Sequence, residues 1–221
     1  MLRLYSGKRT ARILARYAGW IAELSRRFGL PEAWIKAVLR REIEEIDLLD
    51  LAADALVRLY WLRWRLRRLL CRLHLCRRAE PRPRRGPLGK RDSSTGYAQI
   101  FAAVAIDAAN YALERGLEDA AGLGLPEGRR PDRERSEDLC AMWRRLARDP
   151  RFNIRMGALN MLAAAEEMNG HTDIARYGPE ELQRAFTRYN AKVDRITDYG
   201  RRVYAYYLDY SQAPDGAAGT V

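Results

Sequence analysis

The stretch FGLPEAWIKAVLRREIEEI, residues 28–46, indicates how this chain is built, because one helix ends and the next begins within it. Gly29 suits the left-handed conformation that closes many helices, and Pro31 suits the first turn of the helix that follows. In residues 8–27, apolar side chains recur at spacings of three and four, which is the pattern of one helix face. The sequence therefore predicts one helix over 8–27 and a second that runs to about residue 46.

Helical patterns continue through the rest of the chain, with no alternating strand pattern and no internal repeat. A long amphipathic segment extends from about residue 48 to 75, and a Pro/Arg/Gly-rich stretch at 79–90 predicts an exposed loop. Further helices are expected from just after residue 100 to about 115, over 136–148 and 153–169, from Pro179 onward, and near the C-terminus. We expect an all-α, single domain of seven or eight helices over residues 1–211, with a basic helix and loop inserted at about 50–90. A flexible tail is expected at 212–221.

The net charge of +11 comes from one segment of the chain. Residues 63–91 hold twelve arginines and lysines and one acid, whereas the remaining residues carry 28 basic and 28 acidic side chains. In WLRWRLRRLLCRLHLCRR, residues 61–78, apolar positions are as dense as basic ones, which favours a helix packed on the domain with arginine stems along its edge. Attraction to anionic envelope polymers or a membrane surface is the second interpretation, and nucleic-acid binding is the third.

Composition also argues against several classes of protein. No run of about 20 apolar residues is free of charge, so no membrane-spanning helix is expected. Lys8, Arg9 and Arg12 lie where a signal peptide needs its apolar segment, so we expect a protein that is cytoplasmic as synthesised. The cysteines lack a CxxC spacing, and His74 lies far in sequence from His171. We therefore expect no metal site and no cofactor.

The segment STGYAQI, residues 94–100, places one glutamine among small and apolar residues. A buried Gln99 would need hydrogen-bond partners for both ends of its amide. A surface glutamine, by contrast, would not need Gly96 three positions before it. The third interpretation is an amide that points into a cleft, where a ligand completes its hydrogen bonds.

Three short motifs occur in order along the chain: FGLPEAWIKAVLRRE (28–42), STGYAQI, and FTRYNA (186–191). This order resembles the catalytic domain of lytic transglycosylases and goose-type lysozymes, within the lysozyme-like superfamily. Residues 149–162 and 199–210 resemble two further helices of that family. The resemblance covers most of the chain and implies a lysozyme-like fold.

The resemblance also implies a site. It sets Glu42 on the family's catalytic glutamate, matches Gly96 and Gln99 to the family's second motif, and matches Tyr189 and Asn190 to its third. The chain departs from the family pattern at three places, which indicates a divergent bacterial branch. These are Ile43 in place of a serine, Lys192 in place of a glycine, and 56 residues between the glutamate and the glutamine.

The activity that the resemblance implies is cleavage of peptidoglycan between N-acetylmuramic acid and N-acetylglucosamine. In a lytic transglycosylase, Glu42 would protonate the leaving oxygen and then take the proton from the muramic acid 6-hydroxyl, which gives a 1,6-anhydro product. Glu44 and Glu45 are interpreted as surface charges. The residues expected to bind the glycan strand are Ser94, Gly96, Tyr97, Gln99, Tyr189 and Asn190.

Two alternatives remain open at this point. One is a hydrolytic muramidase, which would use Asp92 as a second carboxylate, with Asp47 and Asp50 as further candidates. The other is a non-enzymatic helical module that binds cell wall or nucleic acid through residues 63–91. In the enzymatic case, action at the wall would follow non-classical export or lysis.

Overall fold

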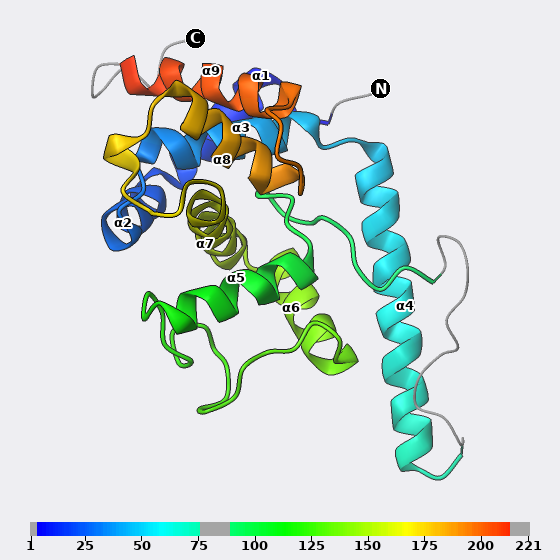
Figure 1. The fold of residues 1–221 in the computed structure, drawn as a ribbon. Helices are drawn as coiled ribbons and strands as arrows, with labels where there is room; N and C mark the ends of the chain where they lie inside the picture. Colours follow the sequence, from blue (N-terminus) through cyan, green and yellow to red (C-terminus); the bar gives the residue numbers. More distant parts are fainter. Residues whose placement is uncertain (1–3, 76–88, 213–221) are drawn as a thin grey trace.

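The computed structural model describes residues 4–75 and 89–212, and within these ranges the chain forms nine α-helices and no β-strand (Figure 1). The expectation of an all-α single domain is confirmed. The helices are α1 (Gly7–Arg16), α2 (Ala18–Phe28), α3 (Glu32–Glu45), α4 (Leu48–Arg72), α5 (Ala102–Glu114), α6 (Ser136–Arg148), α7 (Pro150–Asn169), α8 (Pro179–Asn190) and α9 (Asp198–Gln212). The loop predicted at 79–90 and the tail predicted at 212–221 lie almost wholly outside the described residues.

The prediction of one helix over 8–27 is wrong, because the chain turns at Tyr17 and forms α1 and α2. Tyr17 has φ −103° and ψ 9°, outside the helical region, and its ring packs on Tyr97 with the ring centroids 5.7 Å apart. Both helices lie against α3, and each buries apolar residues, Leu14 from α1 and Leu24 from α2. The apolar spacing therefore continues through the break, which sequence periodicity alone does not reveal.

Helix α3 is a central element of the fold, with Trp34, Ile35, Val38 and Ile43 buried along it. Gly29 has φ 68° and closes α2, as its position in the sequence predicts. Helices α1, α2 and α9 pack around α3. Because α3 is covered on several sides, Glu42 near its end is half-buried.

Close helix contacts in the second half of the molecule depend on two glycines. Helix α7 packs against α5, α6 and α8, and a Cβ atom at Gly157 would lie 2.7 Å from the Cβ of Ala98. A Cβ at Gly200 would lie 2.2 Å from the hydroxyl of Thr187, so the absence of a side chain lets α9 approach α8. In the same way, the absence of a side chain at Gly157 lets the loop at 94–100 approach α7.

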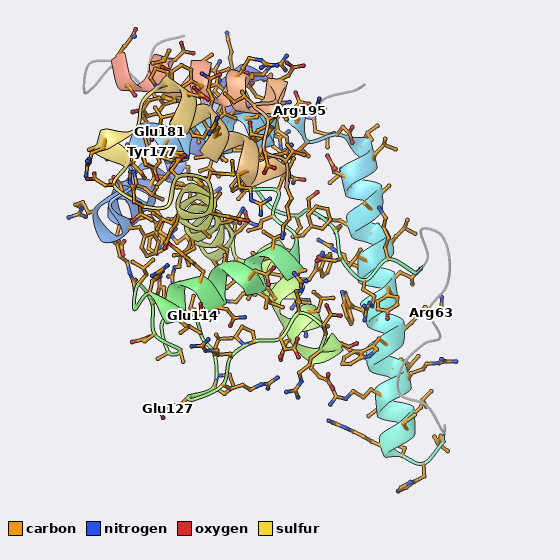
Figure 2. The ribbon with its side chains drawn as sticks, viewed as in Figure 1. Arg63, Glu114, Glu127, Tyr177, Glu181 and Arg195 are labelled. Atoms are coloured by element: carbon orange, nitrogen blue, oxygen red, sulfur yellow. The ribbon has the colours of Figure 1, made fainter. Side chains whose placement is uncertain are left out.

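Helix α4 runs along one side of the molecule (Figure 1). Val57, Trp61 and Trp64 are buried, so the expectation that the basic segment packs on the domain is confirmed for this face of the helix. Among the described residues, no helix is long and apolar enough to cross a membrane. Side chains extend outward along α4, and Arg63 is one of those on its outer side (Figure 2).

Candidate active site

Glu42 lies in the last turn of α3 and faces the start of α9. Its carboxyl group accepts a hydrogen bond from the hydroxyl of Tyr199, in the first turn of α9. Burial raises the pKa of Glu42 to about 7, and the charges of Glu45 and Asp50 act in the same direction, while the Tyr199 bond and Arg41 oppose the shift. A carboxyl group with this pKa exists in both protonation states near neutral pH, so it can give or accept a proton.

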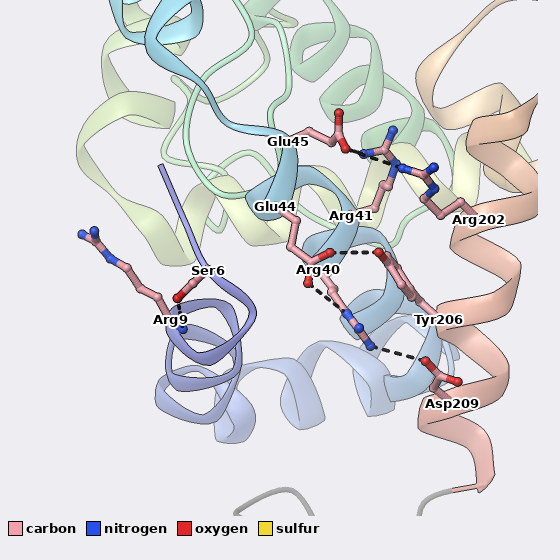
Figure 3. A network of polar contacts seen from close by, with 9 residues as sticks. All are labelled: Ser6, Arg9, Arg40, Arg41, Glu44, Glu45, Arg202, Tyr206 and Asp209. Carbon is pink, nitrogen blue, oxygen red and sulfur yellow. Dashed lines mark hydrogen bonds and ion pairs between the residues drawn. The ribbon is translucent and has the colours of Figure 1, made fainter. Parts of the chain in front are cut away.

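The two glutamates that follow Glu42 are engaged elsewhere (Figure 3). Glu44 accepts from the hydroxyl of Tyr206 at 2.9 Å and from Arg40 at 3.1 Å. Glu45 is exposed, as expected, and pairs with Arg41. Glu44 is not a surface charge, since only 15% of its side chain is exposed. Both carboxylates are held by basic or phenolic partners, which leaves Glu42 as the member of this group with the properties of an acid catalyst.

The loop at 94–100 is built around a buried amide from α7. Asn153 accepts from the backbone N–H of Ala98 at 2.8 Å and donates to the carbonyl of Thr95 at 2.8 Å. Gly96 has φ 72°, and a Cβ atom there would lie 2.3 Å from the Asn153 amide. Gly96 is therefore required both by the backbone conformation and by the close approach of Asn153. The sequence did not identify Asn153 as this anchor, although it lies in the segment 149–162.

Tyr189, near the end of α8, connects this loop to Glu42. Its hydroxyl donates to the carbonyl of Ala98 at 2.6 Å. Burial raises the pKa of Tyr189 well above its usual value, and the negative charge of Glu42 raises it further. Burial and Glu42 raise the pKa of Tyr199 in the same way, with a further contribution from Tyr189. A hydrogen bond therefore joins Tyr189 to the loop at 94–100, and Tyr189 lies near enough to Glu42 to feel its charge.

Gln99 closes the turn of this loop instead of packing in the core. Its backbone has φ 43°, and its side-chain amide donates to the carbonyl of Gly96 at 2.7 Å. The residue is half-buried. In the part of the chain that the structure describes, no group donates to its side-chain carbonyl oxygen, so this oxygen is available to a ligand.

Three other residues that were expected to bind substrate take no part in these hydrogen bonds. Ser94 is half-buried in the loop. Tyr97 packs on the ring of Tyr17, on the side of the loop that faces α1 and α2. Asn190 is exposed at the end of α8. The hydrogen bonds described above bring Gly96, Gln99 and Tyr189 together but include none of these three.

Asp92 caps α5, a helix that lacks a side-chain cap at its own N-terminal residue. One carboxylate oxygen accepts from the N–H groups of Ser93 at 3.0 Å and Ala102 at 2.9 Å, and the other accepts from Ala103 at 2.9 Å. Burial raises the pKa of Asp92, and these backbone bonds oppose that shift. Both oxygens are thus occupied by backbone donors.

The carboxylates at the start of α4 also have structural partners. Asp47 and Asp50 form a reciprocal capping box, in which Asp47 accepts from the N–H of Asp50 at 3.1 Å and Asp50 accepts from the N–H of Asp47 at 3.0 Å. Asp54 accepts from the hydroxyls of Ser93 at 2.6 Å and Thr95 at 2.9 Å, which fixes α4 to the loop. No sequence pattern predicts this last contact.

Within the described ranges, no group of three or more potential metal ligands is found. Comparisons with protein-family models, with curated proteins and with solved structures find no match for this chain.

Proposed function

We propose that this protein is a lytic transglycosylase that cleaves peptidoglycan between N-acetylmuramic acid and N-acetylglucosamine. The observation that carries the proposal is the raised pKa of Glu42, about 7, at a carboxyl group that is bonded to Tyr199 and lies near Tyr189. A glycosidase needs a carboxylic acid that keeps its proton near neutral pH. Two half-buried phenols beside a single carboxyl group form a suitable environment for that acid.

In the proposed reaction, protonated Glu42 donates its proton to the glycosidic oxygen as the bond to C1 of the muramic acid breaks. The Glu42 carboxylate then takes the proton from the 6-hydroxyl of the same sugar, whose oxygen attacks C1 and closes the 1,6-anhydro ring. The glutamate returns to its starting form, and no water is consumed. The Tyr199 hydroxyl holds the carboxylate in place between the two steps.

The environment of the other carboxylates favours this reaction over hydrolysis. An inverting hydrolase uses a second carboxylate, roughly 6.5–9.5 Å from the acid, to activate water. Asp92 has both oxygens bonded to backbone N–H groups, and Asp47 and Asp50 cap each other. A transglycosylase needs no second carboxylate, because the substrate supplies its own hydroxyl group.

The proposal is tested by incubating purified peptidoglycan with the full chain and with the Glu42→Gln variant, which keeps the shape of the side chain and removes the proton. We expect release of soluble muropeptides to fall by a factor of about a thousand. Glu32→Gln is the matched control, because Glu32 lies on the same helix and pairs with Lys36 on the surface. Near-normal activity of Glu42→Gln would overturn the assignment.

A further inference from the structure

A row of leucines lies exposed along α4 and its last turn. Their spacing alternates between three and four residues, so they share one face of the helix. The exposed fractions are 45% for Leu59, 64% for Leu62, 54% for Leu66, 53% for Leu69 and 57% for Leu73. We name these five residues the leucine row. Large leucines this exposed and this regularly spaced form a continuous apolar patch, which marks an interaction surface.

The face of α4 opposite the leucine row packs against the domain, so the leucine row must face outward. Val57, Trp61 and Trp64 are buried, and Arg68 pairs with Glu137 of α6 at 3.0 Å. Residues 57, 61 and 64 lie about half a turn around the helix from 59, 62 and 66. With one face held against the domain, the leucines face outward and cannot be covered by a rotation of α4.

Arginines line both borders of the leucine row. Arg58, Arg65 and Arg72 lie along one border, and Arg63 and Arg67 along the other, all on exposed positions of the helix. Residues 55–75 contain no acidic side chain. The outward surface is thus an apolar strip between two rows of positive charge, which is complementary to a surface with an apolar interior and anionic groups at its boundary.

This charge pattern argues against pairing with a second copy of the chain. In a parallel helix pair with the leucines at the seam, Arg58 of one copy would face Arg63 of the other. In an antiparallel pair, Arg65 would face its own equivalent. Either arrangement brings like charges together, with no acid on this part of the helix to compensate.

The length of the patch also fits a membrane surface. Leu48 and Leu51, in the first turn of α4, are 54% and 51% exposed and lie on the same helix face as the leucine row. The apolar strip therefore extends along the whole helix, which suits a helix that lies in the plane of a lipid interface.

We propose that the outer face of α4 binds the surface of an anionic lipid bilayer. The leucine row enters the boundary between headgroups and acyl chains, and the bordering arginines bind lipid phosphates. The helix lies in the plane of the membrane, with the rest of the domain on the water side.

The test is sedimentation of the full chain with vesicles made of equal amounts of phosphatidylcholine and phosphatidylglycerol, compared with vesicles of phosphatidylcholine alone. We expect binding to the anionic vesicles that weakens as salt is added. The triple variant Leu62→Gln, Leu66→Gln, Leu69→Gln should lower the partition coefficient at least about tenfold. Leu208→Gln is the matched control, because Leu208 is an exposed leucine on α9, and it should bind as the parent does.

Three results would overturn the proposal. They are absence of binding to the anionic vesicles, equal binding by the triple variant, and a dimer of the parent chain that the triple variant abolishes, which would assign the leucine row to self-pairing. Circular dichroism and thermal melting of each variant establish that it is folded. The vesicles contain no glycan, so the outcome does not depend on the function proposed for Glu42.

Discussion

Helices α3 and α4 follow each other along the chain, yet they place their side chains in opposite ways. Near the end of α3, the acidic Glu42 is half-buried beside two phenols, and this burial raises its pKa. Along α4, the apolar leucine row faces the solvent between arginines. Both arrangements cost free energy in an isolated chain. A buried carboxyl group loses its hydration, and an exposed leucine leaves apolar surface in contact with water. Residues placed against their chemical preference are candidates for function, and we propose proton transfer for the first and binding for the second.

The loop contact that supports the site should show the largest effect on stability. Asn153→Ala removes both buried hydrogen bonds to the loop at 94–100 and leaves a cavity beside Gly96. We expect the free energy of unfolding to fall by about 2–4 kcal/mol. Urea unfolding measures it. A loss below about 1 kcal/mol would show that the loop does not depend on this anchor.

The buried carboxyl itself should destabilise the fold at high pH. The pKa of Glu42 is about 7 in the folded chain and 4.5 as a free side chain, so the unfolded state loses its proton first as the pH rises. The contribution of Glu42 to stability is therefore fully present below about pH 4.5 and is lost by about pH 7.

Glu42→Gln removes this pH dependence. At pH 8 we expect the variant to be more stable than the parent by about 1–3 kcal/mol, and at pH 4 we expect the two to be nearly equal. Urea unfolding at both pH values is the measurement. A difference that is the same at the two pH values would contradict the burial of the Glu42 charge.

Removing the Tyr199 hydroxyl should change the pH profile of cleavage. Its hydrogen bond lowers the pKa of Glu42, so Tyr199→Phe should raise that pKa above about 7 and keep Glu42 protonated to higher pH. The alkaline decline of kcat/KM should move upward by less than about one pH unit. Tyr206→Phe, which removes a bond to Glu44 instead, is the control and should leave the decline in place. A downward shift for Tyr199→Phe would contradict the proposed role.

The smallest effect on stability is expected from a substitution in the exposed leucine row of α4. Leu66→Gln changes a side chain that is 54% exposed and keeps a good helix former. The free energy of unfolding should stay within about 0.5 kcal/mol of the parent value. A larger loss in urea unfolding would mean that the domain itself covers the leucine row.

The sequence predicted the helical class and the junction at Gly29 and Pro31, because these follow from local spacing. The assignment of Glu42, Gln99 and Tyr189 to one site stays a prediction from short motifs. The sequence could not predict the break at Tyr17, where two helices share one apolar period. It also could not predict the hydrogen bond from Tyr199 to Glu42, since the two residues are 157 positions apart. Such a contact depends on how α9 packs on α3.

The faces of α4 show another limit of sequence analysis. The predicted amphipathic segment has apolar residues on two opposite sides, tryptophans on one and leucines on the other. Periodicity identifies both rows but does not say which one the domain covers. The structure shows that the tryptophans are buried, which leaves the leucines exposed.

The most direct test of the central claim, that Glu42 serves alone as acid and then base, is mass spectrometry of the muropeptides released from peptidoglycan. Hydrolysis adds a water molecule to each cleaved bond, whereas ring closure through the 6-hydroxyl does not. We predict 1,6-anhydro products without reducing ends, and an Asp92→Asn variant that gives the same products. Products with reducing ends, together with loss of cleavage in Asp92→Asn, would contradict the account and assign Asp92 as the second carboxylate of a muramidase.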